Sequence, residues 1–165
     1  MTDKDIYLWR TTVKTGSQDW KAFEFCLQNN ILGVGWCLRN TDGIPYIPTS
    51  IEECEKKGRM QYDSCRGFVV SIHALKEMAV DDLIWTRHNG VYYLCRVLST
   101  WKYSCDAAHI YEDVINYVDV EFHEIGTVEM VPGRVVNSFR ASAALQRIKG
   151  DVPLKYSEYL YNTIT

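Results

Sequence analysis

The side chains that most often perform catalysis or bind metals are scattered along this 165-residue sequence. Its six cysteines include no C-x-x-C pair, and its four histidines form neither an H-x-H nor an H-E-x-x-H motif. Cys105 and His109 stand four residues apart, as two zinc ligands can, but no second pair of ligands accompanies them. The sequence therefore predicts neither a metal site nor a cofactor.

Acidic residues occur in adjacent pairs at 52–53, 81–82 and 112–113. Neighbours in a strand point to opposite faces, so such pairs rarely meet in one site. The pair Asp81-Asp82 fits better as a cap before the strand that follows it. The G-x-S-x-G, Walker and G-x-G-x-x-G motifs are missing, and residues 121–124 lack the lysine of a nuclease E-x-K element. We expect no catalytic residue, although a Cys–His pair joined from distant positions stays open.

Aromatic side chains offer another chemistry, because flat rings stack on flat ligands. Five Trp, eleven Tyr and five Phe make up 13% of the chain. Most are expected to fill the core, including Trp9 and Trp85 in the middle of predicted strands. If a few of these aromatic side chains line a pocket, the pocket is better suited to binding a ligand than to catalysing a reaction.

Charge is distributed unevenly along the chain. The net charge is −3, which excludes a surface that is basic throughout. Residues 111–129 carry six carboxylates and no Lys or Arg, whereas residues 131–156 carry five Lys or Arg against one Asp. The basic segment, with Arg134 and Arg140, fits either contacts to phosphates or the solvated face of a helix.

Hydrophobic periodicity and turn residues predict the elements. Strands are expected at 6–12, 31–36, 83–87, 91–98, 114–123 and 127–131, and helices at 19–29, 51–57, 66–78, 138–149 and 154–164. Ser17 and Ser50 are the expected N-caps of the first two helices, and Asn89-Gly90 is the turn of a hairpin. A strand is the alternative at 68–72. Residues 99–113 are expected to form a loop, and the glycines within 31–36 indicate a bulge or a close backbone approach.

The length suits one domain over 1–165, with a core at about 5–150 and a C-terminal helix at about 154–164. No apolar run is long enough to span a bilayer, and the polar N-terminus lacks the apolar core of a signal peptide, so we expect a cytoplasmic protein. Strands joined by hairpins, with helices between them, predict an α+β fold: a small curved, mostly antiparallel β-barrel flanked by helices.

Three segments resemble the PUA-like superfamily, in particular its EVE and YTH branches. They are Gly-Val-Gly-Trp at 33–36, Asp-Leu-Ile-Trp at 82–85 with the hairpin strand 92–97, and the tail at 131–139, which is similar to EVE-like domains of bacterial restriction and defence proteins. Asp81 departs from the glycine usual at that position, and residues 38–65 match nothing in the family.

The resemblance implies recognition of DNA or RNA, often through a modified base held among aromatic rings, with or without an effector subunit. By position, Trp36 matches the aromatic wall of the base pocket, and Trp101 and Tyr103 lie where further aromatics of the pocket occur. Arg10, Arg134 and Arg140 are the candidate phosphate contacts.

Each of these residues has a structural alternative, in the core, in loop packing or on the solvated surface. Two other functions stay open for the whole chain, a PUA-like hydrolase or nuclease and a protein-interaction subunit without nucleic-acid binding.

Overall fold

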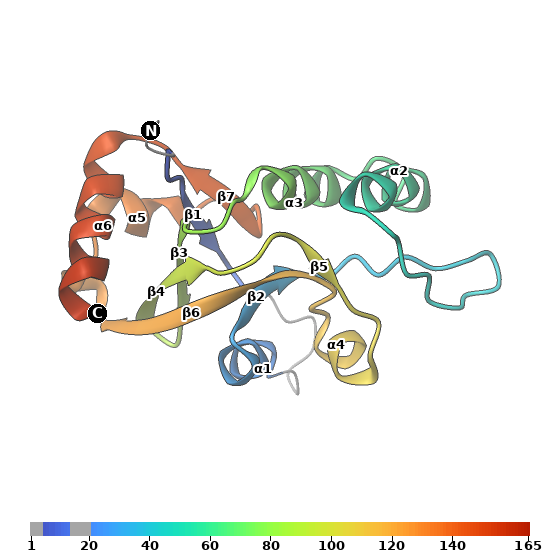
Figure 1. Cartoon of the computed structure of the whole chain (residues 1–165), viewed down its shortest axis with the longest axis horizontal. Coiled ribbons are helices and arrows are strands. Elements are labelled where there is room, and N and C mark those ends of the chain that lie inside the picture. Colours follow the sequence, from blue (N-terminus) through green and yellow to red (C-terminus); the bar gives the residue numbers. More distant parts are fainter. Residues whose placement is uncertain (1–4, 14–20) are drawn as a thin grey trace.

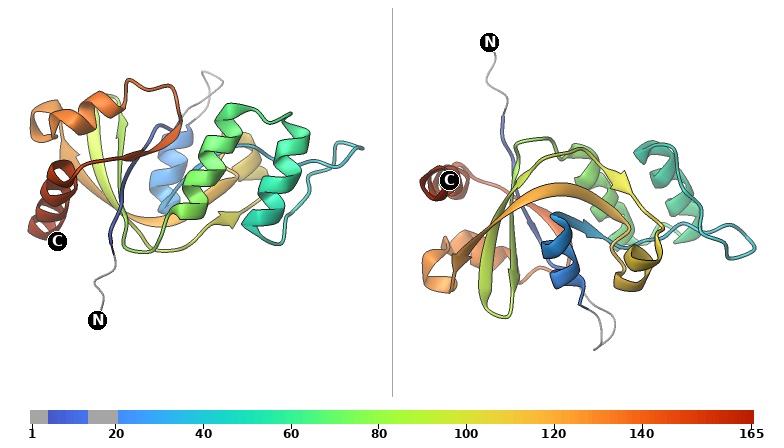
Figure 2. Two further views of the ribbon diagram at one scale, coloured as in Figure 1. Left: turned by 90° about the horizontal axis from the view of Figure 1, so that it is seen from above. Right: turned by 60° about the horizontal axis from the view of Figure 1, so that its bottom comes forward.

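The computed structural model describes residues 5–13 and 21–165 as a mixed α+β fold in which a strongly curled sheet is flanked by helices (Figures 1 and 2). This confirms the predicted fold class. The strand order is β2-β6-β4-β3-β1-β7, and the short strand β5 pairs with the start of β6, on the edge of β6 opposite β2. All pairs are antiparallel except β1 with β3. The strands are β1 (Leu8–Thr11), β2 (Ile31–Val34), β3 (Leu83–His88), β4 (Val91–Val97), β5 (Lys102–Tyr103), β6 (Asn116–Gly126) and β7 (Leu145–Ile148).

Helices cover both ends of this sheet (Figure 1). The pair α2 and α3 lies side by side at one end, α5 and α6 lie at the other, and α1 and α4 lie below β2 and β6 in this view. The helices are α1 (Ala22–Asn29), α2 (Ile51–Gln61), α3 (Arg66–Glu77), α4 (Ala107–Glu112), α5 (Gly133–Ser138), α6 (Asp151–Ile164) and the 3₁₀ turn η1 (Val128–Met130). No helix within the described ranges is both long and apolar enough to cross a bilayer.

Local signals placed several elements correctly. Asn89 and Gly90 both have positive φ, at 50° and 79°, as the tight turn between β3 and β4 requires. Ser50 caps α2, because its Oγ accepts a hydrogen bond from the Glu53 amide at 3.1 Å. Helix α3 replaces the alternative strand at 68–72. Ser17, the predicted cap of α1, lies outside the described residues.

The core lies on both faces of the curled sheet. Trp9 and Trp85 are 1% and 0% exposed, which confirms their assignment to the core. The Trp85 indole donates to Ser157 Oγ at 2.9 Å and so attaches α6 to β3. The Trp9 indole donates to Asp82 Oδ2 at 2.9 Å. Asp82 therefore joins β1 to the start of β3. The sequence predicted only a capping role for the pair at 81–82.

Three predicted elements were wrong. The loop expected at 99–113 contains β5 and α4, and the strand expected at 127–131 is the 3₁₀ turn η1. The helix expected at 138–149 is absent: α5 ends at Ser138, turns follow, and Leu145–Ile148 form the edge strand β7, which pairs with β1. Its buried residues, Leu145 and Ile148, stand three apart. Residues three apart also lie on the same face of a helix, so the pattern alone predicted a helix where the structure has a strand.

Candidate functional site

Trp36 lies just beyond the end of β2 with φ at 68°. A bulky residue with positive φ is a conformational outlier that costs about 1–2 kcal/mol, so the surrounding structure must hold it there. The Trp36 ring meets Tyr62 edge-on, with centroids 5.0 Å apart, and Phe68 at 5.8 Å. These contacts leave the indole half-buried.

Glycines let the chain approach closely around Trp36. A Cβ at Gly33 would lie 2.2 Å from the Asn116 carbonyl oxygen on β6, which confirms the predicted close backbone approach. A Cβ at Gly35 would lie 2.3 Å from Asp113 Oδ1. A Cβ at Gly67, at the start of α3, would lie 3.1 Å from the Trp36 ring.

Two cavities meet at Trp36. The first, of about 380 Å³, opens where β1 and β2 end and is bounded by Trp36, Tyr62, Arg39 and Asp113. The second, of about 590 Å³, lies between the start of α3 and residues 141–144 and includes Arg66 and Gln146. Trp36 and Ala144 line both cavities. Both volumes fall within the range of about 300–1,000 Å³ that is usual for sites of small ligands.

The lining of the first cavity is more apolar than polar. Val13, Val34, Val114 and Ala144 contribute the apolar surface. The Tyr62 hydroxyl donates to the Cys37 carbonyl, and burial raises the pKa of Tyr62 to about 12, so this ring stays neutral. Asp113 is exposed as a whole, but lost hydration on the side facing Gly35 raises the pKa of its carboxyl.

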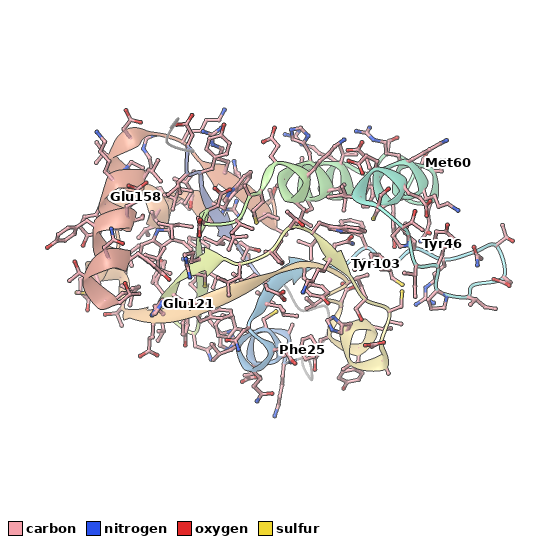
Figure 3. All side chains as sticks on the ribbon, viewed as in Figure 1. Phe25, Tyr46, Met60, Tyr103, Glu121 and Glu158 are labelled. Carbon is pink, nitrogen blue, oxygen red and sulfur yellow. The ribbon has the colours of Figure 1, made fainter. Side chains whose placement is uncertain are left out.

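Trp101 and Tyr103 line neither cavity. The Trp101 indole donates to Asn116 Oδ1 at 2.9 Å, and the Tyr103 hydroxyl accepts from the Leu38 amide at 2.8 Å. Asn116 in turn donates to the Gly35 carbonyl at 2.7 Å. Tyr103 lies on β5, facing the loop that leads to α2 (Figure 3). The two rings therefore support the end of β2 from behind, and the structure does not bring them together with Trp36 around a cavity.

Arg10, predicted to contact phosphate, is instead an internal residue with 0% exposure. Its guanidinium donates to the carbonyl groups of Ala143 and Ala141 and to Gln146 Oε1. Burial next to Arg87 lowers the pKa of Arg10. A phosphate cannot reach Arg10 in this arrangement, so that prediction is corrected: the residue holds β7 and residues 141–144 in place.

The other predicted cations are at the surface. Arg134 and Arg140 are both exposed, and Arg134 donates to the Lys149 carbonyl at 3.3 Å. Arg140 directly precedes the residues that line the second cavity. Arg39 and Arg66 line the cavities themselves, and sequence reasoning missed both because they lie in or beside the segment 38–65 that matched no family element.

A larger hollow of about 840 Å³ lies between residues 38–46 and α2. Tyr46 and Met60, both labelled in Figure 3, belong to its lining. The Lys57 ammonium sits 3.8 Å from the centre of the Tyr46 ring and covers that ring face. This hollow is large, but its Tyr46 ring face is already covered. The first cavity, in contrast, is lined by Trp36 and Tyr62.

No group of three or more His, Cys, Asp or Glu side chains that could hold a metal ion occurs within residues 5–13 and 21–165.

No protein-family model matches the sequence, and no curated protein matches it. Among solved structures, the chain is similar to the YTH domain of the Zygosaccharomyces rouxii MRB1 protein in complex with N6-methyladenosine RNA. The alignment covers 100% of this chain and 93% of the other, with 10% sequence identity and a TM-score of 0.41. At that level the similarity decides neither family nor ligand, and membership of the EVE or YTH branch stays a prediction.

Proposed function

We propose that this protein binds a single unstacked base of a nucleic acid, modified or unmodified, in the first cavity against Trp36. The observation that carries the proposal is the conformation of Trp36. A tryptophan held at a φ of 68° is costly to maintain, and here its side chain lines two cavities.

The energetics of base binding fit this cavity. Taking a base out of its stack costs a few kcal/mol. Stacking on an aromatic ring returns about 1–3 kcal/mol per base. Val34 and Ala144 line the cavity beside Trp36, and a methyl group buried against them would add about 0.8 kcal/mol. A methylated base would therefore bind more tightly than its unmodified counterpart.

Positively charged side chains line or adjoin both cavities, within reach of a strand attached to such a base. Arg39 lines the first cavity, Arg66 lines the second, and Arg140 is exposed just before residues 141–144. Three phosphate contacts to a single strand would make the logarithm of affinity fall with the logarithm of salt concentration with a slope of about −2. This marked dependence on salt separates nucleic-acid binding from binding to an apolar protein surface.

The experiment is a titration of fluorescent single-stranded DNA and RNA oligonucleotides, with and without methylated bases, measured by anisotropy. We expect Trp36→Ala to weaken binding by about 5- to 150-fold, the equivalent of one lost stacking contact. The matched control is Tyr159→Ala, because Tyr159 is 66% exposed on α6 and lines neither cavity. Thermal unfolding must show that both variants stay folded.

The same samples decide between the rival functions. If the wild type binds no oligonucleotide, or if Trp36→Ala binds as tightly as the wild type, the base-binding proposal is wrong. Metal-dependent cleavage of the bound oligonucleotide would show nuclease activity, which the proposal does not include.

A further inference from the structure

Asp113 occupies a defined position at the rim of the first cavity. It follows α4 in the left-handed conformation, with φ at 55°, and its amide hydrogen-bonds back to the carbonyl groups of His109 and Ile110. Asp and Asn tolerate this conformation better than most residues. From this position the Asp113 carboxylate lies against Gly35, which lines the same cavity.

Gly35 makes room for the Asp113 carboxylate. A Cβ on Gly35 would lie 2.3 and 2.5 Å from the two carboxylate oxygens, well inside van der Waals contact. Gly35 has no positive φ, so its backbone conformation does not require glycine. The space left at position 35 is used by the carboxylate of Asp113.

The Asp113 carboxylate has unused capacity to accept hydrogen bonds. None of the residues in the described part of the chain donates a hydrogen bond to it, and Tyr62 on the same cavity directs its hydroxyl to the Cys37 carbonyl. An ionised carboxylate only accepts hydrogen bonds and has about four sites for them. A ligand stacked on Trp36 would thus present its edge near an acceptor to which no described protein group donates.

We propose, on the basis of the proposed base binding, that Asp113 makes this cavity select bases with an exocyclic amino group over bases that carry a carbonyl group in its place. Cytosine presents the N4 amino group and adenine the N6 amino group, whereas thymine presents the O4 acceptor. The amino group donates to the carboxylate. The carbonyl oxygen has no hydrogen to donate and repels the carboxylate.

Two matched sets of bases test this contact. 5-Methylcytosine and thymine carry the same methyl group and differ at position 4, and adenine and hypoxanthine differ at position 6; in each set the neighbouring ring nitrogen gains a proton together with the carbonyl group. Each base is placed at the centre of one single-stranded oligonucleotide, made both as DNA and as RNA, and titrated by anisotropy. We expect the wild type to bind the amino member of each pair about 10-fold or more tightly.

Two variants test the residue. Asp113→Asn keeps the shape but adds an amide donor that can serve a carbonyl oxygen, so the preference should fall to about 3-fold or less, chiefly through tighter binding of thymine and hypoxanthine. Gly35→Ala should reduce the preference as well, because its methyl group displaces the carboxylate. The control is Glu112→Gln. Glu112 is the neighbouring carboxylate, it lines neither cavity, and it accepts a hydrogen bond from the Lys21 amide.

The outcomes separate this inference from the proposed function. Binding that depends on Trp36 without a preference for amino bases, or a preference that survives Asp113→Asn, overturns the role of Asp113 alone. A folded wild type that binds none of the oligonucleotides overturns both. A preference that is lost in Asp113→Asn and kept in Glu112→Gln supports it.

Discussion

Gly58 in α2 faces the ring of Phe68 in α3, and replacing it with alanine tests how tightly the two helices are packed beneath Trp36. A Cβ on Gly58 would lie 1.9 Å from Phe68 Cζ and 2.5 and 2.6 Å from the two Cε atoms. Carbon atoms in favourable contact are about 3.5–4.0 Å apart. Phe68 is 0% exposed, so its ring has no open space into which it could move.

Two opposing effects set the size of the change. Alanine in place of glycine in a helix gains about 1 kcal/mol. Overpacking a filled core costs about 1–3 kcal/mol. We therefore expect Gly58→Ala to lower the free energy of unfolding by up to about 2 kcal/mol. Binding to Trp36 should weaken too, because the same ring supports the indole.

The variant Phe68→Leu reverses the sign of this effect. Leucine has no atoms at the Cζ and Cε positions, so the added methyl group fills space that would otherwise be empty. In that background Gly58→Ala should raise the free energy of unfolding by about 1 kcal/mol. The double-mutant cycle should then show a coupling of about 1–3 kcal/mol between the two positions.

Urea unfolding followed by circular dichroism measures all four proteins, and an unchanged slope with urea shows that the unfolded states are comparable. The reasoning is refuted if Gly58→Ala stabilises the wild type, or if the effects of the two substitutions simply add. Either result would show that the Phe68 ring is not the reason why position 58 requires glycine.

Three further substitutions each test the role of one residue. Asp82 is 1% exposed and accepts hydrogen bonds from Tyr7 N, Trp9 Nε1 and Ala79 N. Asp82→Asn turns an amide donor toward one of these donors, so it should lower the free energy of unfolding in urea by about 2–4 kcal/mol. A loss below about 1 kcal/mol contradicts this. Trp101→Phe should cost about 1–2 kcal/mol by removing the hydrogen bond to Asn116. It should affect oligonucleotide binding far less than Trp36→Ala, and an equal loss would place Trp101 in the site. For Asp113, the raised pKa means that the folded protein holds the proton more tightly, so stability falls as pH rises from about 3.8 through the folded pKa. Asp113→Asn should therefore raise Tm more at neutral pH than below about pH 3.8, and the opposite trend would show that the carboxylate is stabilised in the folded state.

Signals carried by a few neighbouring residues were enough for part of this fold. The β3–β4 turn follows from Asn89-Gly90, because few residues besides glycine and asparagine adopt positive φ at low cost. The start of α2 follows from Ser50, whose side chain bonds the Glu53 amide three residues later. The sequence also indicated Trp36, through its resemblance to the tryptophan that follows the glycine-containing strand in PUA-like domains, and its role in binding stays a prediction.

Contacts between distant residues decided the rest. Residues 145–148 form a strand because they pair with the free edge of β1, which lies more than 130 residues earlier in the chain. Arg10 and Arg140 are the same residue type, yet one is fully buried and the other exposed, because only Arg10 faces the carbonyl groups of residues 141–143. The approach of Asp113 to Gly35 joins positions far apart in sequence, which no local spacing contains. The sequence by itself determined turns, caps and the apolar residues of the core, whereas the cavity at Trp36 depends on which surfaces meet when the sheet curls, and only the tertiary structure decides that.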